Sequence, residues 1–301
     1  MSSLHQVSTA PAQRGARRTS YPSLGPWRCV RLLGRGRWTE VYQAAAASQF
    51  HTSADYVLKT LRPEGRDDPL ARSMLQRQAH LGKQISDPHL ESVLASHVDA
   101  PPYYLVTALM DGATLLATLK QTPRLSTPHS LWLARQCALG LRTLHRFAWL
   151  HGDIKPANVF VSSTGHATLI DLGLARRIGQ RPDPAASVLT GTPAYAAPES
   201  GSTSIPTGAY SDVYSLGVTL FEMLTGRLPY IADKPSDLMK AHLEHSLPEP
   251  RHFAPWLPRR VSRLLASMLA KQPLRRPSVG ELIDWLVDLE IDVLEERLLV
   301  E

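Results

Sequence analysis

The chain has 301 residues, of which 43% are hydrophobic and 20% are charged, a composition typical of a soluble globular protein. Its formal net charge is +6, but much of the N-terminal excess lies in Arg14, Arg17 and Arg18 of a Ser/Pro-rich leader. Because no basic segment interleaved with aromatic residues follows, we interpret the charge as a solvated tail and surface, and nucleic-acid binding is not expected.

Cysteine content and apolar patterning exclude further classes. Cys29 and Cys137 are the only cysteines, too few for a disulfide framework or a structural zinc site. The leader lacks the apolar core of a signal peptide, and no uncharged apolar run reaches the roughly 18 residues that span a membrane. We therefore expect a cytoplasmic protein without a membrane span.

The N-terminal part changes from a leader to a strand-rich segment. Residues 1–26 are rich in Ser, Pro and Arg without periodicity, which predicts a disordered basic leader. Residues 27–110 alternate short apolar runs with turn residues, which predicts a small β-rich lobe with one main helix. The expected strands are Arg28–Leu33, Val41–Ala46, Tyr56–Thr60, Val93–Val98 and Tyr103–Thr107, and the expected helix is Asp68–Ile85.

Beyond Asp111-Gly112 the pattern becomes helical. Residues 111–289 are predicted to form a larger α-helical lobe, so that residues 27–289 make one α+β domain with a cleft between its lobes. Strands are expected at Val159–Val161 and Ala167–Ile170, and helices at Pro128–Phe147, Ser211–Thr225, Asp237–His245, Arg259–Leu269 and from Val279 onward.

The last helix carries an apolar stripe among many acids. Leu282, Leu286, Leu289, Val293 and Leu294 belong to this stripe. Such spacing predicts a final helix packed on the large lobe, and docking of a partner, including a second copy of the chain, is the alternative. Residues 290–301 are assigned to a C-terminal helical extension.

One polar segment suits the transfer of a phosphoryl group. His151-Gly152-Asp153-Ile154-Lys155-Pro156-Ala157-Asn158 is followed, after a hairpin-length gap, by Asp171-Leu172-Gly173. Asp153 can orient an attacking hydroxyl and accept its proton, while Lys155 can balance charge on the phosphate. Oxygens of Asn158 and Asp171 can hold a divalent metal ion. We therefore predict Asp153 and Lys155 as catalytic residues, and Asn158 and Asp171 as metal ligands.

Two features of the strand-rich segment suit the phosphates of a nucleotide. The segment Leu33–Val41 contains Gly34 and Gly36, and glycine lets the backbone approach phosphate closely, although paired glycines also occur in ordinary hairpins. Lys59 ends an apolar strand and is a predicted contact to the α- and β-phosphates; a solvated strand-end charge is the alternative. The nucleotide-binding candidates here are Leu33, Gly34, Gly36, Val41 and Lys59.

These motifs together resemble the eukaryotic-like (Hanks-type) protein kinases, specifically the bacterial serine/threonine kinases, over about residues 27–289. Further matching segments are Gly191–Glu199, Ser211–Gly217 and Leu274–Pro277. The resemblance implies the two-lobed protein-kinase fold, with ATP and Mg²⁺ (or Mn²⁺) as cofactors. It also implies transfer of the γ-phosphoryl group to serine or threonine hydroxyls of protein substrates, including autophosphorylation.

The resemblance assigns roles to other residues. Backbone groups of Ala108 and Met110 are expected to read adenine, and Thr107 to be the gatekeeper of the pocket. Two supporting interactions are implied as well: an ion pair between Glu199 and Arg276, and bonds from Asp212 to the backbone of the catalytic loop.

Two departures from the family lie on the helix of the small lobe. Gln78 stands where the family has a glutamate that pairs with Lys59; its amide oxygen accepts a hydrogen bond but carries no full charge. Glu91 and Glu64 are the candidate substitutes for this glutamate, but neither has the right spacing. Gly82 replaces an apolar residue that stacks on the leucine of Asp-Leu-Gly, so a gap and a weaker helix are expected.

Three further departures surround the cleft. Gly152 replaces an arginine that meets an activation-loop phosphate, so phosphorylation of Ser187 or Thr190 is not expected to be the main switch. Val57 replaces an alanine above adenine, and Thr39 replaces the third glycine of the glycine-rich segment.

A working kinase is the favoured prediction because the residues nearest the reacting atoms are all present. The alternative is a pseudokinase, a nucleotide-binding regulatory or scaffold module whose output is its shape. Protein substrates are the expected partners, and a cognate phosphatase, a regulator and a second copy of the chain are further candidates.

Overall fold

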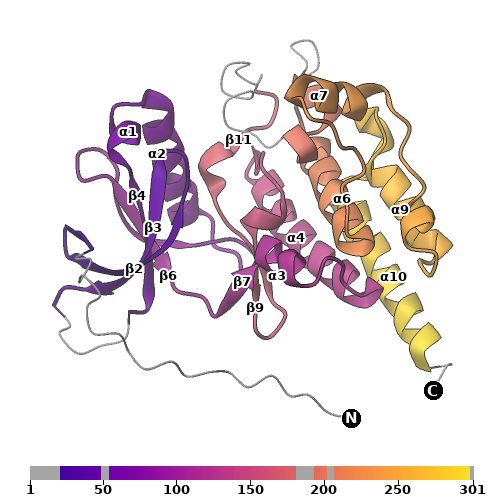
Figure 1. Ribbon diagram of the computed structural model, residues 1–301, viewed down its shortest axis with the longest axis horizontal. Helices are drawn as coiled ribbons and strands as arrows, with labels where there is room; N and C mark the ends of the chain where they lie inside the picture. Colours follow the sequence, from indigo (N-terminus) through magenta and orange to yellow (C-terminus); the bar gives the residue numbers. More distant parts are fainter. Residues whose placement is uncertain (1–20, 49–53, 181–192, 202–206, 299–301) are drawn as a thin grey trace.

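Two lobes of different secondary structure make up the computed structural model, which describes residues 21–48, 54–180, 193–201 and 207–298 (Figure 1). The small lobe is built around one antiparallel sheet, and the larger lobe is mainly helical. This arrangement confirms the predicted α+β, two-lobed fold. In the part of the chain that the structure describes, no helix has the length and apolar character needed to cross a membrane.

Six antiparallel strands form the sheet of the small lobe, in the order β1-β2-β3-β4-β6-β5. Tyr42, Ala44, Leu58 and Val106 form a core on one face, because successive side chains of a strand point to opposite faces. The strand β1 lies inside the predicted leader, so the sheet of the small lobe includes residues before Trp27. The bounds are β1 Ser23–Leu24, β2 Trp27–Arg35, β3 Thr39–Ala46, β4 Tyr56–Leu61, β5 Val93–His97 and β6 Tyr104–Ala108.

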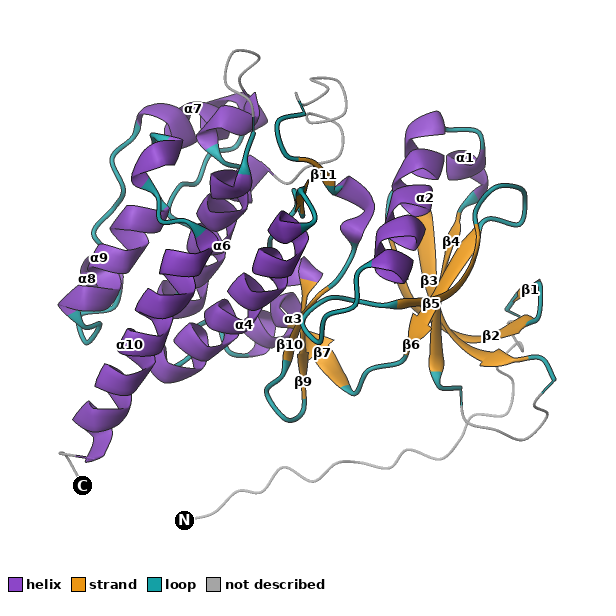
Figure 2. Ribbon diagram, turned by 180° about the vertical axis from the view of Figure 1, so that it is seen from behind, coloured by secondary structure: helices purple, strands orange, loops and turns teal. Residues whose placement is uncertain are grey.

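The main helix of the small lobe, α2 (Pro69–Gln84), packs on the other face of this sheet (Figure 2). Asp68 caps its N-terminus, since Oδ1 accepts hydrogen bonds from the backbone N–H of Leu70 (2.8 Å) and Ala71 (3.3 Å). A short helix, α1 (Pro63–Arg66), precedes it. The apolar contact between α2 and the sheet consists of Leu61, Ala71, Leu75, Val93 and Leu105.

The large lobe has a continuous apolar core around α4 (Thr127–Arg146) and α6 (Ala209–Thr225). Both helices are buried along most of their length, and Leu172, beyond the helices, belongs to the same core. The core therefore ties the Asp-Leu-Gly segment to the helical lobe. The other helices are α3 Leu115–Gln121, α7 Pro235–Glu244, α8 Pro250–Phe253, α9 Arg259–Met268 and α10 Val279–Leu298.

Two small sheets fix the loops that face the small lobe. In one, β9 (Val159–Ser162) pairs with β7 (Gly112–Thr114) and β10 (Ala167–Leu169). In the other, β8 (Trp149–Leu150) pairs with β11 (Arg176–Arg177). The loops 151–158 and 170–175 leave these strands together and are joined by a hydrogen bond from Ile170 N to the Asn158 carbonyl (2.9 Å).

The last helix packs on the large lobe, as predicted. Leu282, Leu286 and Leu289 are buried, and α10 lies along α4 (Figure 2). Arg135 Nε of α4 also donates a hydrogen bond to Glu290 Oε1 at 2.8 Å. The helix α10 is continuous to Leu298. The predicted C-terminal extension from residue 290 is therefore the second half of this helix and does not form a separate element.

The expected gap beside Gly82 is wrong. Gly82 is buried in α2, and a Cβ atom built on it would lie only 2.5 Å from Cγ2 of Val93. The side chain of Val93, itself 6% exposed, fills the place that a larger residue on α2 would take. Glycine therefore lets α2 approach β5 closely, and the core contact of the small lobe depends on it.

Gly82→Ala is expected to lower the free energy of unfolding by about 1–3 kcal/mol, because the added methyl group overpacks the contact with Val93. Urea denaturation measures this change, and Val93→Ala in the same chain should recover part of it. Gly280→Ala on α10 is the matched control, since nothing lies within 4 Å of its Cβ position. Equal stabilities of the two single variants would contradict this account of Gly82.

Candidate active site

The loop between β8 and β9 is held in place by Asp212 of α6. Its carboxylate accepts hydrogen bonds from the backbone N–H of His151 (2.9 Å) and Gly152 (3.0 Å) and lies 2.9 Å from His145 Nε2. Burial alone would raise the pKa of Asp212, but the bond to His145 and the backbone donors hold it below its ordinary value. The predicted contact of Asp212 with the catalytic-loop backbone is confirmed.

Three predicted site residues of this loop meet at one carboxylate. Lys155 Nζ lies 2.7 Å from Asp153 Oδ2, and Asn158 Nδ2 donates a hydrogen bond to the same oxygen at 2.7 Å. Asn158 Nδ2 also donates to the Asp153 carbonyl at 2.8 Å, so its Oδ1 is the atom left to accept. Burial raises the pKa of Asp153, and the positive charge of Lys155 acts against that rise.

The backbone explains why glycine stands at position 152. Gly152 has φ of +76°, in the left-handed region, and a Cβ atom there would lie 2.8 Å from the Leu174 carbonyl. A larger residue would be strained and would push the loop away from the Asp-Leu-Gly segment. The arginine expected from the family therefore does not fit this backbone. Ser187 and Thr190, named with this departure, lie outside the described residues.

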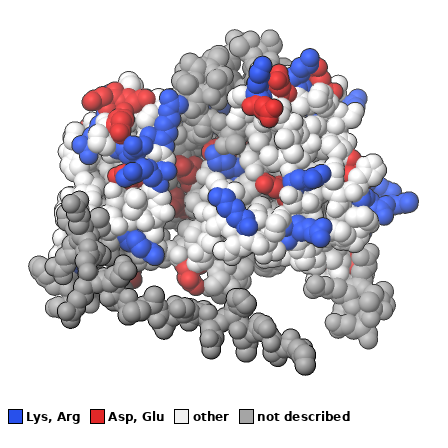
Figure 3. Space-filling model, viewed as in Figure 1, with Lys and Arg blue, Asp and Glu red and all other residues white. Residues whose placement is uncertain are grey.

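Asp171 faces the loop from the adjoining segment and pairs with the small lobe. Its Oδ1 accepts hydrogen bonds from Lys59 Nζ at 2.7 Å and from Gly173 N at 3.3 Å. Burial would raise its pKa, but the charge of Lys59 outweighs burial and lowers it. Acidic atoms are visible in the hollow between the lobes (Figure 3). Lys59, inside β4 and not at its end as predicted, thus bonds the large lobe.

Lys59 is also bonded to α2, as predicted. Its Nζ donates to Gln78 Oε1 at 2.8 Å, and Gln78 is 3% exposed. Gln78 Nε2 in turn donates to Glu91 Oε2 at 2.9 Å, so Glu91 joins the site although its sequence spacing from Lys59 argued against it. Burial raises the pKa of Glu91, and the charge of Lys59 acts in the opposite direction. The contact that brings Glu91 to the site joins the segment between α2 and β5 to β10, and only the folded chain shows it.

A second side chain of α2 reaches the Asp-Leu-Gly segment. Arg77 Nη1 donates a hydrogen bond to the Gly173 carbonyl at 2.8 Å. Burial lowers the pKa of this guanidinium. Sequence reasoning did not single out Arg77, because an arginine on a helix is usually a solvated surface charge.

The donor atoms fit a magnesium ion. Asn158 Oδ1 and Asp171 Oδ2 accept no hydrogen bond from any described residue, and both are hard oxygen ligands of the kind that Mg²⁺ takes. Within the described ranges no group of three acidic, histidine or cysteine side chains could hold a metal alone. A magnesium ion here would complete its shell with phosphate oxygens and water.

The glycine-rich segment forms the turn between β2 and β3. Gly34 pairs with Val41 across the hairpin, and Gly36 N donates to the Thr39 carbonyl at 2.8 Å. Arg62 Nη1 bonds the carbonyls of Gly36 and Arg37, which braces the turn from the end of β4. The candidates Leu33, Gly34, Gly36 and Val41 therefore lie together on one hairpin, next in the sheet to the strand that carries Lys59.

The segment predicted to read adenine connects the two lobes. Ala108 ends β6, and Met110 lies in the short connection to β7, which belongs to the large lobe. Leu109 N is already bonded to the Asp55 carbonyl at 2.8 Å. Thr107 of β6 is 2% exposed and pairs with Val57 of β4, so these two residues are neighbours in the sheet.

The predicted ion pair of Glu199 and Arg276 is confirmed. Arg276 Nη1 and Nη2 donate to the two carboxylate oxygens of Glu199 at 2.7 and 2.8 Å, and both side chains are almost fully buried. Arg276 also bonds the carbonyls of Ala270, Tyr210 and Lys271. Burial would raise the pKa of Glu199, but Arg276 lowers it. The pair fixes the segment 193–201 to the C-terminal part of the lobe.

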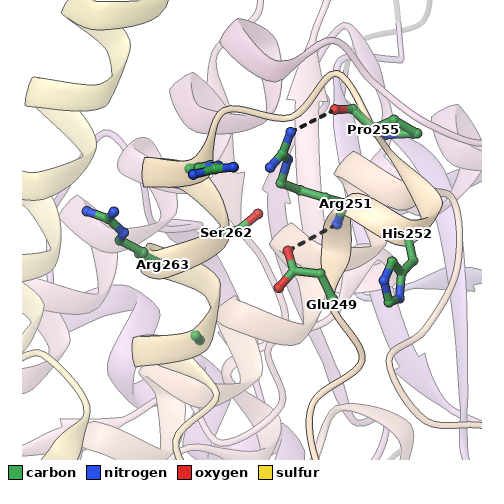
Figure 4. A pocket seen from close by; sticks show the side chains of 8 residues that line it. Glu249, Arg251, His252, Pro255, Ser262 and Arg263 are labelled. Atoms are coloured by element: carbon green, nitrogen blue, oxygen red, sulfur yellow. Dashed lines mark hydrogen bonds between the residues drawn. The ribbon is translucent and has the colours of Figure 1, made fainter.

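A surface cavity of about 560 Å³ lies elsewhere, on the large lobe between α8 and α9 (Figure 4). Arg251, Arg259 and Arg263 line it together with His252 and Glu249. Glu249 accepts a hydrogen bond from Arg251 N, and Arg251 Nη2 donates to the Pro255 carbonyl. It contains none of the predicted catalytic residues and is distinct from the site between the lobes.

The fold and this site define the protein-kinase class: a small β-rich lobe with a lysine, a helical lobe with an acid–lysine–amide loop, and a second acid beside them. The known family of the protein kinase domain matches residues 27–285. The chain therefore belongs to the protein kinase family, which confirms the predicted resemblance.

The chain is similar to several mycobacterial proteins named serine/threonine-protein kinases. It is 32% identical over 260 residues to PknD of Mycobacterium tuberculosis, an overlap of 86% of this chain and 39% of PknD. It is 31% identical to PknH of Mycobacterium bovis, over 86% of this chain and 43% of PknH. It is also 31% identical to PknE of Mycobacterium tuberculosis, over 83% of this chain and 43% of PknE. The chain thus spans about two fifths of the length of these relatives.

Arg276→Met is expected to lower the free energy of unfolding by about 3–5 kcal/mol, because it leaves the carboxylate of Glu199 buried without its partner. Arg260→Met is the matched control: the Arg260–Asp292 pair is half exposed, and its loss should cost no more than about 1 kcal/mol. Urea denaturation of both variants measures the difference. Similar losses in the two variants would contradict a structural role for the Glu199–Arg276 pair.

Proposed function

We propose that the chain is a serine/threonine protein kinase, which transfers the γ-phosphoryl group of ATP to hydroxyl groups of proteins, its own included. The observation that carries this proposal is that Lys155 and Asn158 both bond the carboxylate of Asp153. Asp171 lies close enough for its negative charge to raise the pKa of Asp153. Family membership and the similarity to kinases named for serine and threonine support it.

On the substrate side, Asp153 would accept a hydrogen bond from the attacking hydroxyl and take its proton. A carboxylate whose pKa is raised by burial is a stronger base than a solvated one, which suits this role. Lys155, 2.7 Å from Asp153, would balance charge on the transferring phosphoryl group. Most of the rate gain would then come from positioning and charge neutralisation.

On the nucleotide side, Lys59 would hold the α- and β-phosphates beneath the β2–β3 hairpin. Leu33 and Val41 would cover the base, while the backbone of Ala108 and Met110 would read its edge. Asn158 and Asp171 would hold Mg²⁺ (or Mn²⁺), which neutralises phosphate charge. The lowered pKa of Asp171 keeps this carboxylate ionised and available to a cation at neutral pH.

The protein substrates, a cognate phosphatase, a regulator, a dimer and cytoplasmic location stay predictions. PknD, PknH and PknE are named serine/threonine-protein kinases, and the serine/threonine preference proposed here agrees with those names. A pseudokinase is the second candidate. It is favoured by one observation, the neutral Gln78 in place of a carboxylate next to Lys59.

Autophosphorylation with Mg-ATP separates the two candidates. Wild-type protein is expected to gain phosphate on serine or threonine, and Asp153→Asn to lower the rate at least about 100-fold, because it removes the general base. Asp288→Asn, the same change on an exposed residue of α10, is the matched control and should leave the rate unchanged. Equal phosphate incorporation in wild type and Asp153→Asn would contradict the proposal, and nucleotide-dependent melting without turnover would support the pseudokinase.

The acid side of the pH–rate profile should report Asp153. A base must be unprotonated, so the rate falls as the pH drops through its pKa, and Lys155 holds that pKa down. Lys155→Met should therefore shift the acid limb of kcat to higher pH, besides slowing the reaction. The control is Lys240→Met, at an exposed lysine of α7. An unshifted limb in Lys155→Met would show that Asp153 is not the group that titrates.

A further inference from the structure

Beside the carboxylate of Asp171, a second carboxylate lies close to Lys59, and it comes from the segment between α2 and β5. Lys59 Nζ of β4 donates to Gln78 Oε1 of α2 at 2.8 Å, and Gln78 Nε2 donates to Glu91 Oε2 at 2.9 Å. The backbone N–H of Asp171 also points at Glu91 Oε2, at 3.4 Å. The result is a chain of bonds from an ammonium group through an amide to a carboxylate.

The backbone fixes Glu91 in this place. Leu90 forms an isolated parallel bridge with Leu169 of β10, and Glu91 N donates to the Leu169 carbonyl at 2.9 Å. These bonds anchor the segment between α2 and β5 to the large lobe, two residues before Asp171. The backbone of Glu91 is therefore fixed beside the strand that leads into the Asp-Leu-Gly segment, and its carboxylate reaches Gln78 and the backbone N–H of Asp171 from there.

Only one orientation of the Gln78 amide satisfies both partners. An ammonium group can only donate, so it requires the amide oxygen. Glu91 Oε2 also faces the backbone N–H of Asp171, so it acts as an acceptor and requires the amide nitrogen. The carboxylate polarises the amide and makes its oxygen a better acceptor for Lys59. A glutamine with no acid behind it would be a less polarised acceptor and would hold the lysine less strongly.

We propose that Glu91 is a positioning residue for Lys59: it supplies, through the amide of Gln78, the negative charge that the family places on the α2 position itself. The other acid considered, Glu64, cannot take this role, because its side chain is 64% exposed and bonded to Arg62. Asp171 is the acid that bonds Lys59 directly, but it is also a predicted metal ligand. Glu91 gives the lysine an anchor that does not depend on Asp171.

A charge swap tests the proposal with the surrounding bonds preserved. In Glu91→Gln the amide of Gln78 loses its anion; in Gln78→Glu two carboxylates are forced together at hydrogen-bond distance. In Gln78→Glu with Glu91→Gln the charge moves to α2, where it bonds Lys59 directly, while the new glutamine can donate to it and still accept from Asp171 N. The Mg-ATP dissociation constant, kcat and KM for ATP are measured for wild type and all three variants, with thermal melting as the check on folding.

The two single variants are expected to bind Mg-ATP about 5–10-fold more weakly and to lose a similar factor in kcat/KM, and the double variant to return within about threefold of wild type. Wild-type binding by Glu91→Gln would overturn the proposal, and so would a double variant as impaired as Glu91→Gln. A purely structural role for Glu91 would lower the melting temperature without recovery in the double variant.

The inference rests on the proposed phosphoryl transfer only for the kinetic comparison. Absence of transfer in wild type would count against the proposed function, while the binding comparison would still decide the role of Glu91.

Discussion

The ammonium group of Lys59 is the point at which the two lobes are held in register. It bonds Asp171 of the large lobe and Gln78 of α2. Its strand, β4, pairs with β3 of the glycine-rich hairpin on one side and with β6 on the other. Loss of this charge would leave the partly exposed carboxylate of Asp171 without its ion-pair partner and Gln78 of α2 without its bond to β4. The hairpin, α2 and the metal-ligand segment are therefore joined at one partly buried ion pair and one hydrogen bond, which the Arg77–Gly173 and Glu91–Leu169 bonds support from either side.

The departures from the family pattern have local explanations in the packing. Gly82 makes room for Val93, Gly152 accommodates a left-handed backbone against the Leu174 carbonyl, and Gln78 is backed by Glu91. For Gly82 and Gln78, a residue of another segment takes over the missing space or charge; at Gly152, the Leu174 carbonyl leaves no room for a side chain. These substitutions change how the cleft is supported, while the acid, lysine and amide of the catalytic loop keep their contacts.

Much of the fold and site followed from the sequence because the signals were local. Long periodic elements such as α4 and α6 agree with prediction within one or two residues, the usual uncertainty at element ends. Short elements were missed because a few residues carry no periodic pattern, namely β1, β7, β8, β11, α1, α3 and α8. Glu91 and Val93 could not be placed, since their roles come from contacts between segments that lie far apart in the chain.

A crystal structure with Mg²⁺ and a non-hydrolysable ATP analogue tests the central claim most directly, namely that the cleft is a complete nucleotide site aligned through Lys59. The account predicts the phosphates between the β2–β3 hairpin and Lys59, Mg²⁺ on Asn158 and Asp171, and an intact chain of bonds from Lys59 through Gln78 to Glu91. A nucleotide bound without Mg²⁺ on these residues, or a Lys59 turned away from both the phosphates and Gln78, would contradict it.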